Sequence, residues 1–253
     1  MAPLLTWSLA APRMLKRASG RMLLSHICKF IYLKTRKTAG TSLEIYFEPF
    51  CIDPKNYNGE NHHRDSAVSE WGIVGTRGKA EGPWFNHMSA AQVRAGVGEQ
   101  IWEDYFKFCA VRNPFDKTVS YFWHELTPEL RQRLREVDFS EVRAAFDAWT
   151  ELRRFPFDAF IYTLDGAAAV DDFIRYEHMQ ADTSRICRAL NIPWQPERLR
   201  RYKGDMRLRS EGFEEYYTPA SAARVAKAFA WELEFFQYPD ITAHHAPRPR
   251  SST

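Results

Sequence analysis

The hydrophobic positions near the start of the chain change from a continuous run to a helical spacing. Residues 30–33 (FIYL) form a short apolar run of β-prone residues. Apolar side chains then recur at helical intervals until Pro49, at Leu43, Tyr46 and Phe47. A continuous run is typical of a buried strand, and the later spacing is typical of an amphipathic helix. The pattern therefore predicts a strand, a turn and a helix in close succession.

The same change of pattern occurs a second time. Residues 105–111 (YFKFCAV) have the pattern of a buried strand, and Asn113, Pro114 and Asp116 follow it. Asn is a favoured N-cap and Pro suits the first helical position, so a capped helix is predicted. Its buried face consists of Phe115, Val119, Phe122, Trp123 and Leu126.

Later segments continue this alternation. Helices are predicted over residues 128–137 and 139–153, and a third core strand over residues 173–176. Glu177 follows this strand and is predicted to be a structural carboxylate that accepts hydrogen bonds. A last helix starts at Thr218 and Pro219, with a core face of Val225, Phe229, Leu233 and Phe236. Alternating strands and helices predict a three-layer α/β fold with a mostly parallel central sheet flanked by helices. Ligands bind such sheets at the carboxyl ends of the strands.

Residues 34–42, which we call the first anion element, join the first strand to its helix. Thr41 and Glu44 match a T-x-x-E capping box, which places the helix N-terminus at the end of the turn. The backbone N–H groups from Ala39 to Ser42 then face a ligand, and Gly40 lets the backbone approach it. A positive charge and hydroxyl donors come from Lys37, Thr38, Thr41 and Ser42.

Residues 112–120, which we call the second anion element, join the second strand to its helix. Arg112 lies at the end of the strand. Ser120 falls on the side of the helix away from its apolar face, together with Asp116 and Lys117. Arg112 and Ser120 can therefore converge on one anion.

Each element also has a simpler interpretation. Thr41 can be only a helix cap, and Lys34, Arg36 and Lys37 only a solvated basic loop. Arg112 can be part of a surface ion pair. The Walker pattern is absent because Lys37 precedes the glycine of the turn, which disfavours an ordinary ATPase or GTPase.

Taken together, KTAGTSL (residues 37–43) and RNPFDKTVSYF (residues 112–122) resemble the two signature elements of sulfotransferases that use 3′-phosphoadenosine-5′-phosphosulfate (PAPS). The resemblance continues through FNHMSAAQVR, DDFIRYEHMQAD and YYTPASAARVAKAFAWELEFFQY, so it covers roughly residues 29–240. It looks closest to the bacterial and carbohydrate-type members. One departure is Arg36, where those members often have proline before the turn lysine.

The resemblance implies a P-loop NTPase-like fold and assigns roles to the two elements. It implies that the 5′-phosphosulfate site is lined by Lys37, Thr38, Ala39, Gly40, Thr41 and Ser42. Arg112 and Ser120 would hold the 3′-phosphate. Lys203 and Arg207, in a basic segment around Gly204, would be secondary donor contacts, although a solvated charge run is the alternative.

His87 is the predicted general base, chiefly on the resemblance of the FNHMSA segment and because proton acceptance near neutral pH is needed. A structural histidine is the alternative. If a stable His87 variant kept most of its activity, His62, His63 or Glu60 would be considered for the base. The long loop between the two elements is predicted to bind the acceptor, with Trp71, Trp84 and Phe85 as stacking groups. His62 and His63 have no partner ligands at a metal-binding spacing, so no metal site is predicted.

Composition sets the organisation of the chain. The 253 residues are 45% hydrophobic and 26% charged, which suits a single domain. We expect an N-terminal extension (1–28), the domain (29–240) and a disordered tail (241–253). The 35 Lys and Arg exceed the 32 Asp and Glu by only 3, so no nucleic-acid partner is predicted.

The cysteines and the N-terminus bear on the compartment. The four cysteines are widely separated, which favours a reducing compartment, and we expect a cytoplasmic protein. The apolar patch near the N-terminus is too short and too interrupted to span a membrane, so no membrane anchor is predicted. The sequence leaves the oligomeric state open.

The interpretation that fits these features best is transfer of a sulfuryl group from PAPS to an acceptor hydroxyl, on a carbohydrate or a small alcohol. Two alternatives remain at this point. One is a nucleotide-dependent kinase, and the other is a non-catalytic module that binds anionic glycans through the basic segment 198–209.

Overall fold

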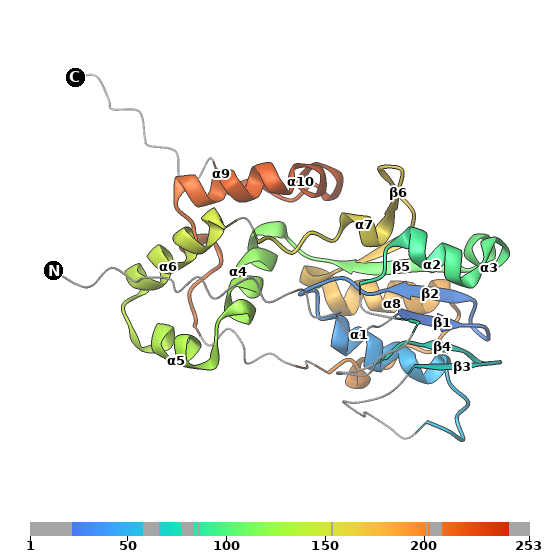
Figure 1. Ribbon diagram of the computed structural model, residues 1–253. Coiled ribbons are helices and arrows are strands. Elements are labelled where there is room, and N and C mark those ends of the chain that lie inside the picture. Colours follow the sequence, from blue (N-terminus) through green and yellow to red (C-terminus); the bar gives the residue numbers. More distant parts are fainter. Residues whose placement is uncertain are drawn as a thin grey trace, which may run out of the picture.

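The computed structural model describes residues 22–57, 66–76, 83–84, 87–152, 154–200, 202 and 209–242. A six-stranded mixed sheet forms its centre (Figure 1). The strands are β1 (Met22–Ser25), β2 (Phe30–Leu33), β3 (Ala67–Ser69), β4 (Gly72–Val74), β5 (Phe106–Val111) and β8 (Asp172–Arg175). Their order is β3-β4-β1-β2-β5-β8. A separate hairpin consists of β6 (Thr163–Leu164) and β7 (Ala167–Ala168).

The prediction of a mostly parallel sheet is wrong. Only β2, β5 and β8 run parallel to one another, whereas β1 pairs antiparallel with β2 and β4, and β3 pairs antiparallel with β4. The physical reason is the short connection between β1 and β2, residues 26–29, because a parallel pair needs a much longer crossover. The structure also places Met22–Ser25 inside the sheet, although the sequence gives no prediction of a strand there.

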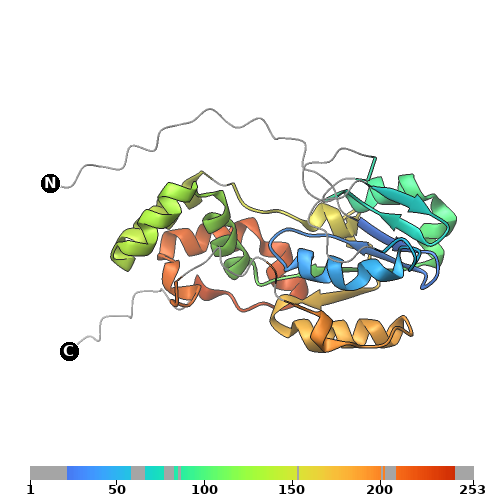
Figure 2. The ribbon, with the colours of Figure 1, turned by 90° about the horizontal axis from the view of Figure 1, so that it is seen from below.

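Helices cover both faces of the sheet, so the three-layer arrangement is confirmed (Figures 1 and 2). Phe30 and Tyr32 of β2 face one layer, and Ile31 and Leu33 face the other, as the alternation of a strand requires. The first layer contains α1 (Gly40–Phe47) and α8 (Met179–Ala189). The second contains α2 (Ala90–Val97), α3 (Glu99–Asp104), α7 (Ala159–Tyr162) and α10 (Ala230–Phe236).

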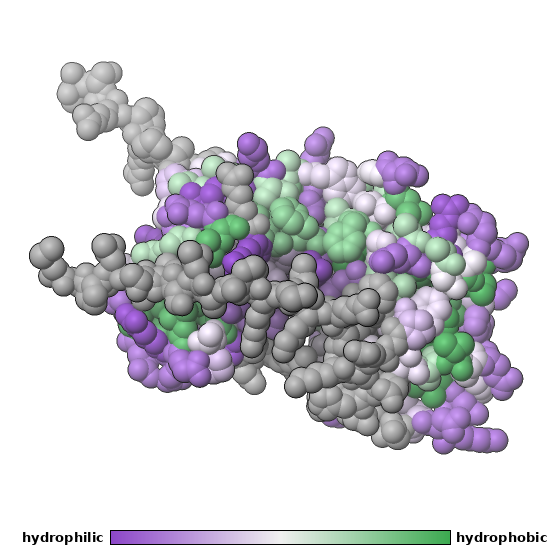
Figure 3. Space-filling model, viewed as in Figure 1, coloured by the Kyte–Doolittle hydropathy of each residue, from purple (hydrophilic) through white to green (hydrophobic). Residues whose placement is uncertain are grey.

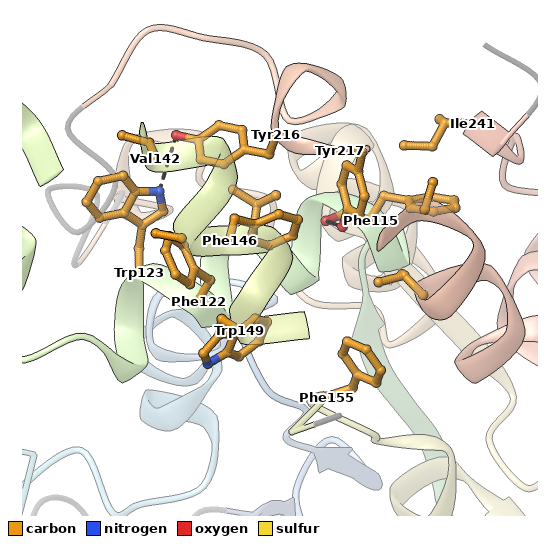
Figure 4. Packing of buried hydrophobic residues seen from close by; sticks show 14 of the residues in the cluster. Phe115, Phe122, Trp123, Val142, Phe146, Trp149, Phe155, Tyr216, Tyr217 and Ile241 are labelled. Carbon is orange, nitrogen blue, oxygen red and sulfur yellow. Dashed lines mark hydrogen bonds between the residues drawn. The ribbon is translucent and has the colours of Figure 1, made fainter. Parts of the chain in front are cut away.

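A helical cluster continues the fold beyond the carboxyl ends of the parallel strands (Figure 1). It consists of α4 (Pro114–Glu125), α5 (Pro128–Glu136), α6 (Phe139–Glu151) and α9 (Pro219–Ala228). Its core is aromatic, and Phe146 packs edge-on against Phe122, Tyr216 and Tyr217 (Figure 4). The Trp123 indole N–H donates to the Tyr216 hydroxyl at 3.2 Å, so this polar group is satisfied inside the core. Short 3-10 turns are η1 (Glu48–Phe50), η2 (Tyr176–His178), η3 (Pro196–Arg198) and η5 (Glu214–Tyr216).

Most of the predicted elements are confirmed within a residue or two. Asn113 caps α4 by accepting the N–H of Phe115, and all five residues of the predicted buried face are buried. Thr218 caps α9 as expected, but the last helix is interrupted at Phe229, which separates α9 from α10.

The four cysteines are free thiols, and Cys51, Cys109 and Cys187 are buried. Over the ranges that the structure describes, every helix is too short or too polar to cross a membrane.

Candidate functional site

Three chain segments meet where the parallel strands β2, β5 and β8 end. The Arg112 guanidinium, after β5, lies 4.0 Å from the centre of the Tyr176 ring, after β8. The Asn113 N–H donates to the Glu177 carboxylate at 2.7 Å, and the Tyr238 hydroxyl donates to the same carboxylate at 3.0 Å. The predicted structural role of Glu177 is therefore confirmed, and this edge of the sheet is the candidate site.

The backbone of the first anion element has the geometry of an anion site. Helix α1 begins at Gly40, and its N-cap is Ala39, with φ 58°. Lys37 is also left-handed, with φ 59°. Turns of this kind gather successive N–H groups into a concavity, and the first N–H groups of a helix have no partner within it.

The predicted capping box is wrong. The N-cap is Ala39, which lies two residues before Thr41. The Glu44 carboxylate accepts a hydrogen bond from the Lys34 ammonium at 2.8 Å and does not cap the helix. Both charged groups are buried, and burial of a charge requires a partner of this kind. Lys34 therefore lies beneath the turn and does not belong to a solvated loop. Gly40 makes room for it, because a Cβ at this position would lie 2.8 Å from Lys34 Cε.

The predicted hydroxyl donors of the first anion element differ in their surroundings. Thr38 is buried, and its hydroxyl is 2.8 Å from the Thr35 hydroxyl, which donates to the Ala110 carbonyl. The Thr38 side chain thus ties the turn to β5. Thr41 is half-buried.

Ser42 connects the first anion element with the basic segment. Its buried hydroxyl accepts the N–H of Tyr202 at 3.2 Å, so the chain passes the start of α1 just before Lys203. Lys203 and Arg207 themselves lie outside the described residues. Arg209 donates to three carbonyls at the end of α5 and is paired with Glu211. Arg209 is therefore a structural group and does not belong to a solvated charge run.

Arg112 joins the two anion elements. Its Nε–H donates to the Asp116 carboxylate at 2.8 Å, and its Nη1–H donates to the Lys37 carbonyl at 3.0 Å. The ion pair with Asp116 is largely buried, unlike a surface pair. Nη2 also lies 2.7 Å from the Asp116 carboxylate, so these contacts leave about two of the five guanidinium N–H donors for an anion. Ser120 is half-buried and lies one helical turn beyond Asp116 on the same side of α4.

His87 packs against the start of the first anion element. Its Nδ1 is 2.9 Å from the Lys34 carbonyl. Because a carbonyl only accepts, Nδ1 carries the hydrogen and Nε2 keeps the lone pair. Burial lowers the pKa of His87 to about 4, since the imidazolium loses solvation. The ring is therefore neutral at neutral pH, and it titrates below the range expected from the sequence.

Lys117 and Asp158 form a buried pair that the sequence does not predict. Lys117 does not lie on the open side of α4; its ammonium is 2.7 Å from the Asp158 carboxylate. The same carboxylate accepts the backbone N–H of Arg36 at 2.8 Å. Asp158 follows a segment without periodic pattern and belongs to no motif, so only its place before the short apolar run of α7 marks it.

The loop between the anion elements is described in part. Trp71 lies at the opposite end of the sheet, where its carbonyl accepts the N–H of His26 in the turn before β2. The prediction that Trp71 stacks on the acceptor beside the anion elements is therefore wrong. Trp84 packs against Gly96 of α2. Outside the described residues lie Glu60, His62, His63 and Phe85.

Across the described part of the chain, no group of three or more His, Cys, Asp or Glu side chains is placed to hold a metal ion.

The flanked sheet and the anion elements at its carboxyl edge define an α/β protein whose candidate site is suited to an anionic group at a helix N-terminus. Comparison with protein families gives a match to the Sulfotransferase family over residues 21–239. The chain belongs to this family, and the protein is a PAPS-dependent sulfotransferase with a P-loop-like fold. Searches of curated proteins and of solved structures gave no significant match. Membership decides against the kinase and the non-catalytic module.

The residues present fit the anionic donor that the family uses. The left-handed turn at Lys37 and Ala39, the start of α1 and the Arg112 guanidinium supply N–H donors and positive charge at one edge of the sheet. Phosphate and sulfonate oxygens are acceptors only, so this set of groups matches their chemistry.

Proposed function

We propose that the protein transfers the sulfuryl group of PAPS to a hydroxyl of a carbohydrate or small alcohol, and that the two anion elements bind the donor. The observation that carries this proposal is the 3.0 Å contact of the Arg112 guanidinium with the Lys37 carbonyl. This contact holds the positive charge of Arg112, after β5, next to the left-handed backbone before α1. Both lie at the edge of the sheet where α/β folds bind their ligands. When bound, the donor supplies an activated sulfuryl group.

The two elements would divide the donor between them. Lys37, the N–H groups from Ala39 to Thr41 and the Thr41 hydroxyl are proposed for the 5′-phosphosulfate, whereas the Ser42 N–H donates to the Ala39 carbonyl at 2.8 Å. Thr38 would act through the position of the turn, because its side chain is buried against Thr35. Arg112 and Ser120 are proposed for the 3′-phosphate. The contact of Tyr202 with Ser42 supports Lys203 and Arg207 as further donor contacts.

Lys37 and His87 are the proposed catalytic residues. The Lys37 ammonium would stabilise the negative charge that develops on the leaving bisphosphate, as a preorganised cation does in group transfer. Nε2 of His87 carries a lone pair and would accept the proton of the acceptor hydroxyl while its oxygen forms the bond to sulfur. The Nδ1 contact with the Lys34 carbonyl fixes this tautomer.

Aromatic side chains next to the first anion element support an acceptor with a flat apolar face. Phe157 and Phe160 are 42% and 44% exposed, and the Arg36 guanidinium lies 5.8 Å from the centre of the Phe160 ring. Hydrophobic surface gathers in this region, at the position of α7 (Figure 3). Sugar rings and small aromatic alcohols both have such a face.

Nucleotide binding tests the proposed donor site. Adenosine 3′,5′-bisphosphate should raise the melting temperature markedly and adenosine 5′-phosphate only weakly, because Arg112 and Ser120 would contact the extra phosphate. Arg112→Ala should abolish the difference. Arg94→Ala, which removes another ion-paired arginine on α2, is the control and should preserve it. Equal stabilisation of the wild type by both nucleotides would contradict the assignment.

A further inference from the structure

Asp158 connects the two anion elements through one carboxylate oxygen. Its Oδ2 accepts the backbone N–H of Arg36 at 2.8 Å and lies 2.7 Å from the Lys117 ammonium. Arg36 precedes the left-handed Lys37 of the first element, and Lys117 is on α4 in the second element. The three residues come from segments far apart in the chain, so this contact forms only in the folded protein.

The carboxylate of Asp158 does not serve its own helix. Asp158 is the N-cap of α7, a position where an Asp side chain commonly accepts N–H groups of the first turn, yet it makes no such hydrogen bond. Its hydrogen bonds go instead to Arg36 and Lys117. An ordinary helix cap therefore does not explain this side chain.

Burial makes the arrangement specific. The side chains of Asp158 and Lys117 are 0% and 6% exposed, and a buried charge is tolerated only with a close partner. The charged groups around the pair include Arg36, whose Nε is 3.9 Å from Asp158 Oδ1, and Glu232, which lines the same small pocket as Asp158, Lys117 and Arg112. Lys117 thus balances a carboxylate whose other contact is a backbone N–H of the turn.

The contact with Arg36 depends on the residue type at this position. The donor is a backbone N–H, which every residue except proline has, so the turn can be held from residue 36 because this residue is not a proline. On the other side of Lys37, its backbone carbonyl accepts a hydrogen bond from the Arg112 guanidinium. The backbone on both sides of Lys37 is thus held by charged groups.

We propose that Asp158 is a positioning residue for sulfuryl transfer, which sets the place of the Lys37 backbone relative to α4. The proposal rests on the donor site proposed above. Asp158 is too deeply buried to touch the donor and acts through the Arg36 N–H. A small displacement of a group that contacts the reacting atoms lowers the rate strongly, even when the fold persists.

Two double variants separate this role from simple charge balance. The first variant combines Lys117→Met with Asp158→Asn, and the second combines Lys117→Met with Asp158→Leu. In both, the side chains at the two positions are uncharged and close in shape to the original ones. Only the first retains an oxygen at residue 158 that can accept the Arg36 N–H. We expect kcat of the Leu variant to be at least roughly tenfold below that of the Asn variant. The comparison is made below the melting temperatures of both, with bisphosphate affinity measured alongside.

The outcomes distinguish this proposal from the donor site itself. A wild type that does not bind the bisphosphate contradicts the donor site. A wild type that binds it, with equal kcat in the two folded double variants, overturns the role of Asp158 alone. If a double variant does not fold, amide hydrogen exchange of the wild type decides: slow exchange of the Arg36 N–H is expected, and exchange at the rate of an open loop overturns the proposal.

Discussion

The charged residues of the site have two different tasks, and residue type alone does not separate them. Lys34 and Lys37 are three positions apart in the same basic turn. Lys34 is buried and paired with Glu44, so it holds α1 in place. Lys37 is half-buried in the left-handed part of the turn, where a cation can reach a ligand. Burial therefore distinguishes a structural lysine from the proposed catalytic one.

His87 gives a prediction of pH dependence at this scale. Its pKa is lowered by burial from 6.5 to about 4 in the folded protein. Below pH 6.5 the unfolded chain binds a proton that the folded protein does not bind until about pH 4, so stability is lost as the pH falls through this window. Between pH 8 and pH 5, the loss attributable to His87 is about 2 kcal/mol of unfolding free energy.

His87→Asn is the matched variant, because Asn tolerates the left-handed φ of 57° and its amide can donate to the Lys34 carbonyl. It should lack this pH-dependent loss, keep bisphosphate binding and lower kcat by roughly a hundredfold. Denaturant unfolding at pH 8 and pH 5, with kinetics at pH 7.5, measures all three. Parallel loss of stability in both proteins would contradict the lowered pKa, and near-normal turnover would remove His87 as the base.

At the scale of elements, the sequence predicts where strands and helices begin better than how their ends are capped. The apolar runs identify β2 and β5, and Asn113 and Thr218 cap α4 and α9 as expected. The T-x-x-E pattern at Thr41 fails, because Glu44 finds a buried partner in Lys34 from the end of β2. Tertiary ion pairs of this kind are invisible to a local pattern.

The start of α1 yields a pair of substitutions with opposite effects. Ala39 is left-handed, which costs a residue with a Cβ roughly 1 kcal/mol, so Ala39→Gly should stabilise by up to about that amount. Gly40→Ala should destabilise by roughly 1–3 kcal/mol, because the new Cβ meets a Lys34 chain that Glu44 holds in place. Denaturant unfolding of both variants checks the signs. A Gly40→Ala protein as stable as the wild type would mean that Lys34 moves aside at little cost.

At the scale of the whole molecule, the sequence predicts the edge that carries the site but not the topology of the sheet. Lys37 and Arg112 come together because β2 and β5 are parallel neighbours, which the repeated change from strand to helix pattern implies. The antiparallel half of the sheet is not predicted, because β1 precedes the recognisable motifs and β3 and β4 are short. Asp158 is missed for a related reason, since its partners Arg36 and Lys117 are distant in sequence.

The place of β1 between β4 and β2 leads to a prediction about the start of the domain. Met22, Leu23 and Leu24 are at most 1% exposed and pack against both helical layers, so β1 is part of the core. A protein lacking residues 1–28 should fail to fold, because β2 and β4 lose their shared partner strand. A protein lacking only residues 1–20 retains β1 and the whole family match, and should melt close to the full chain. Thermal melting by circular dichroism and bisphosphate binding compare the two proteins. A cooperative melt of the protein lacking residues 1–28, near the wild-type temperature, would contradict this role of β1.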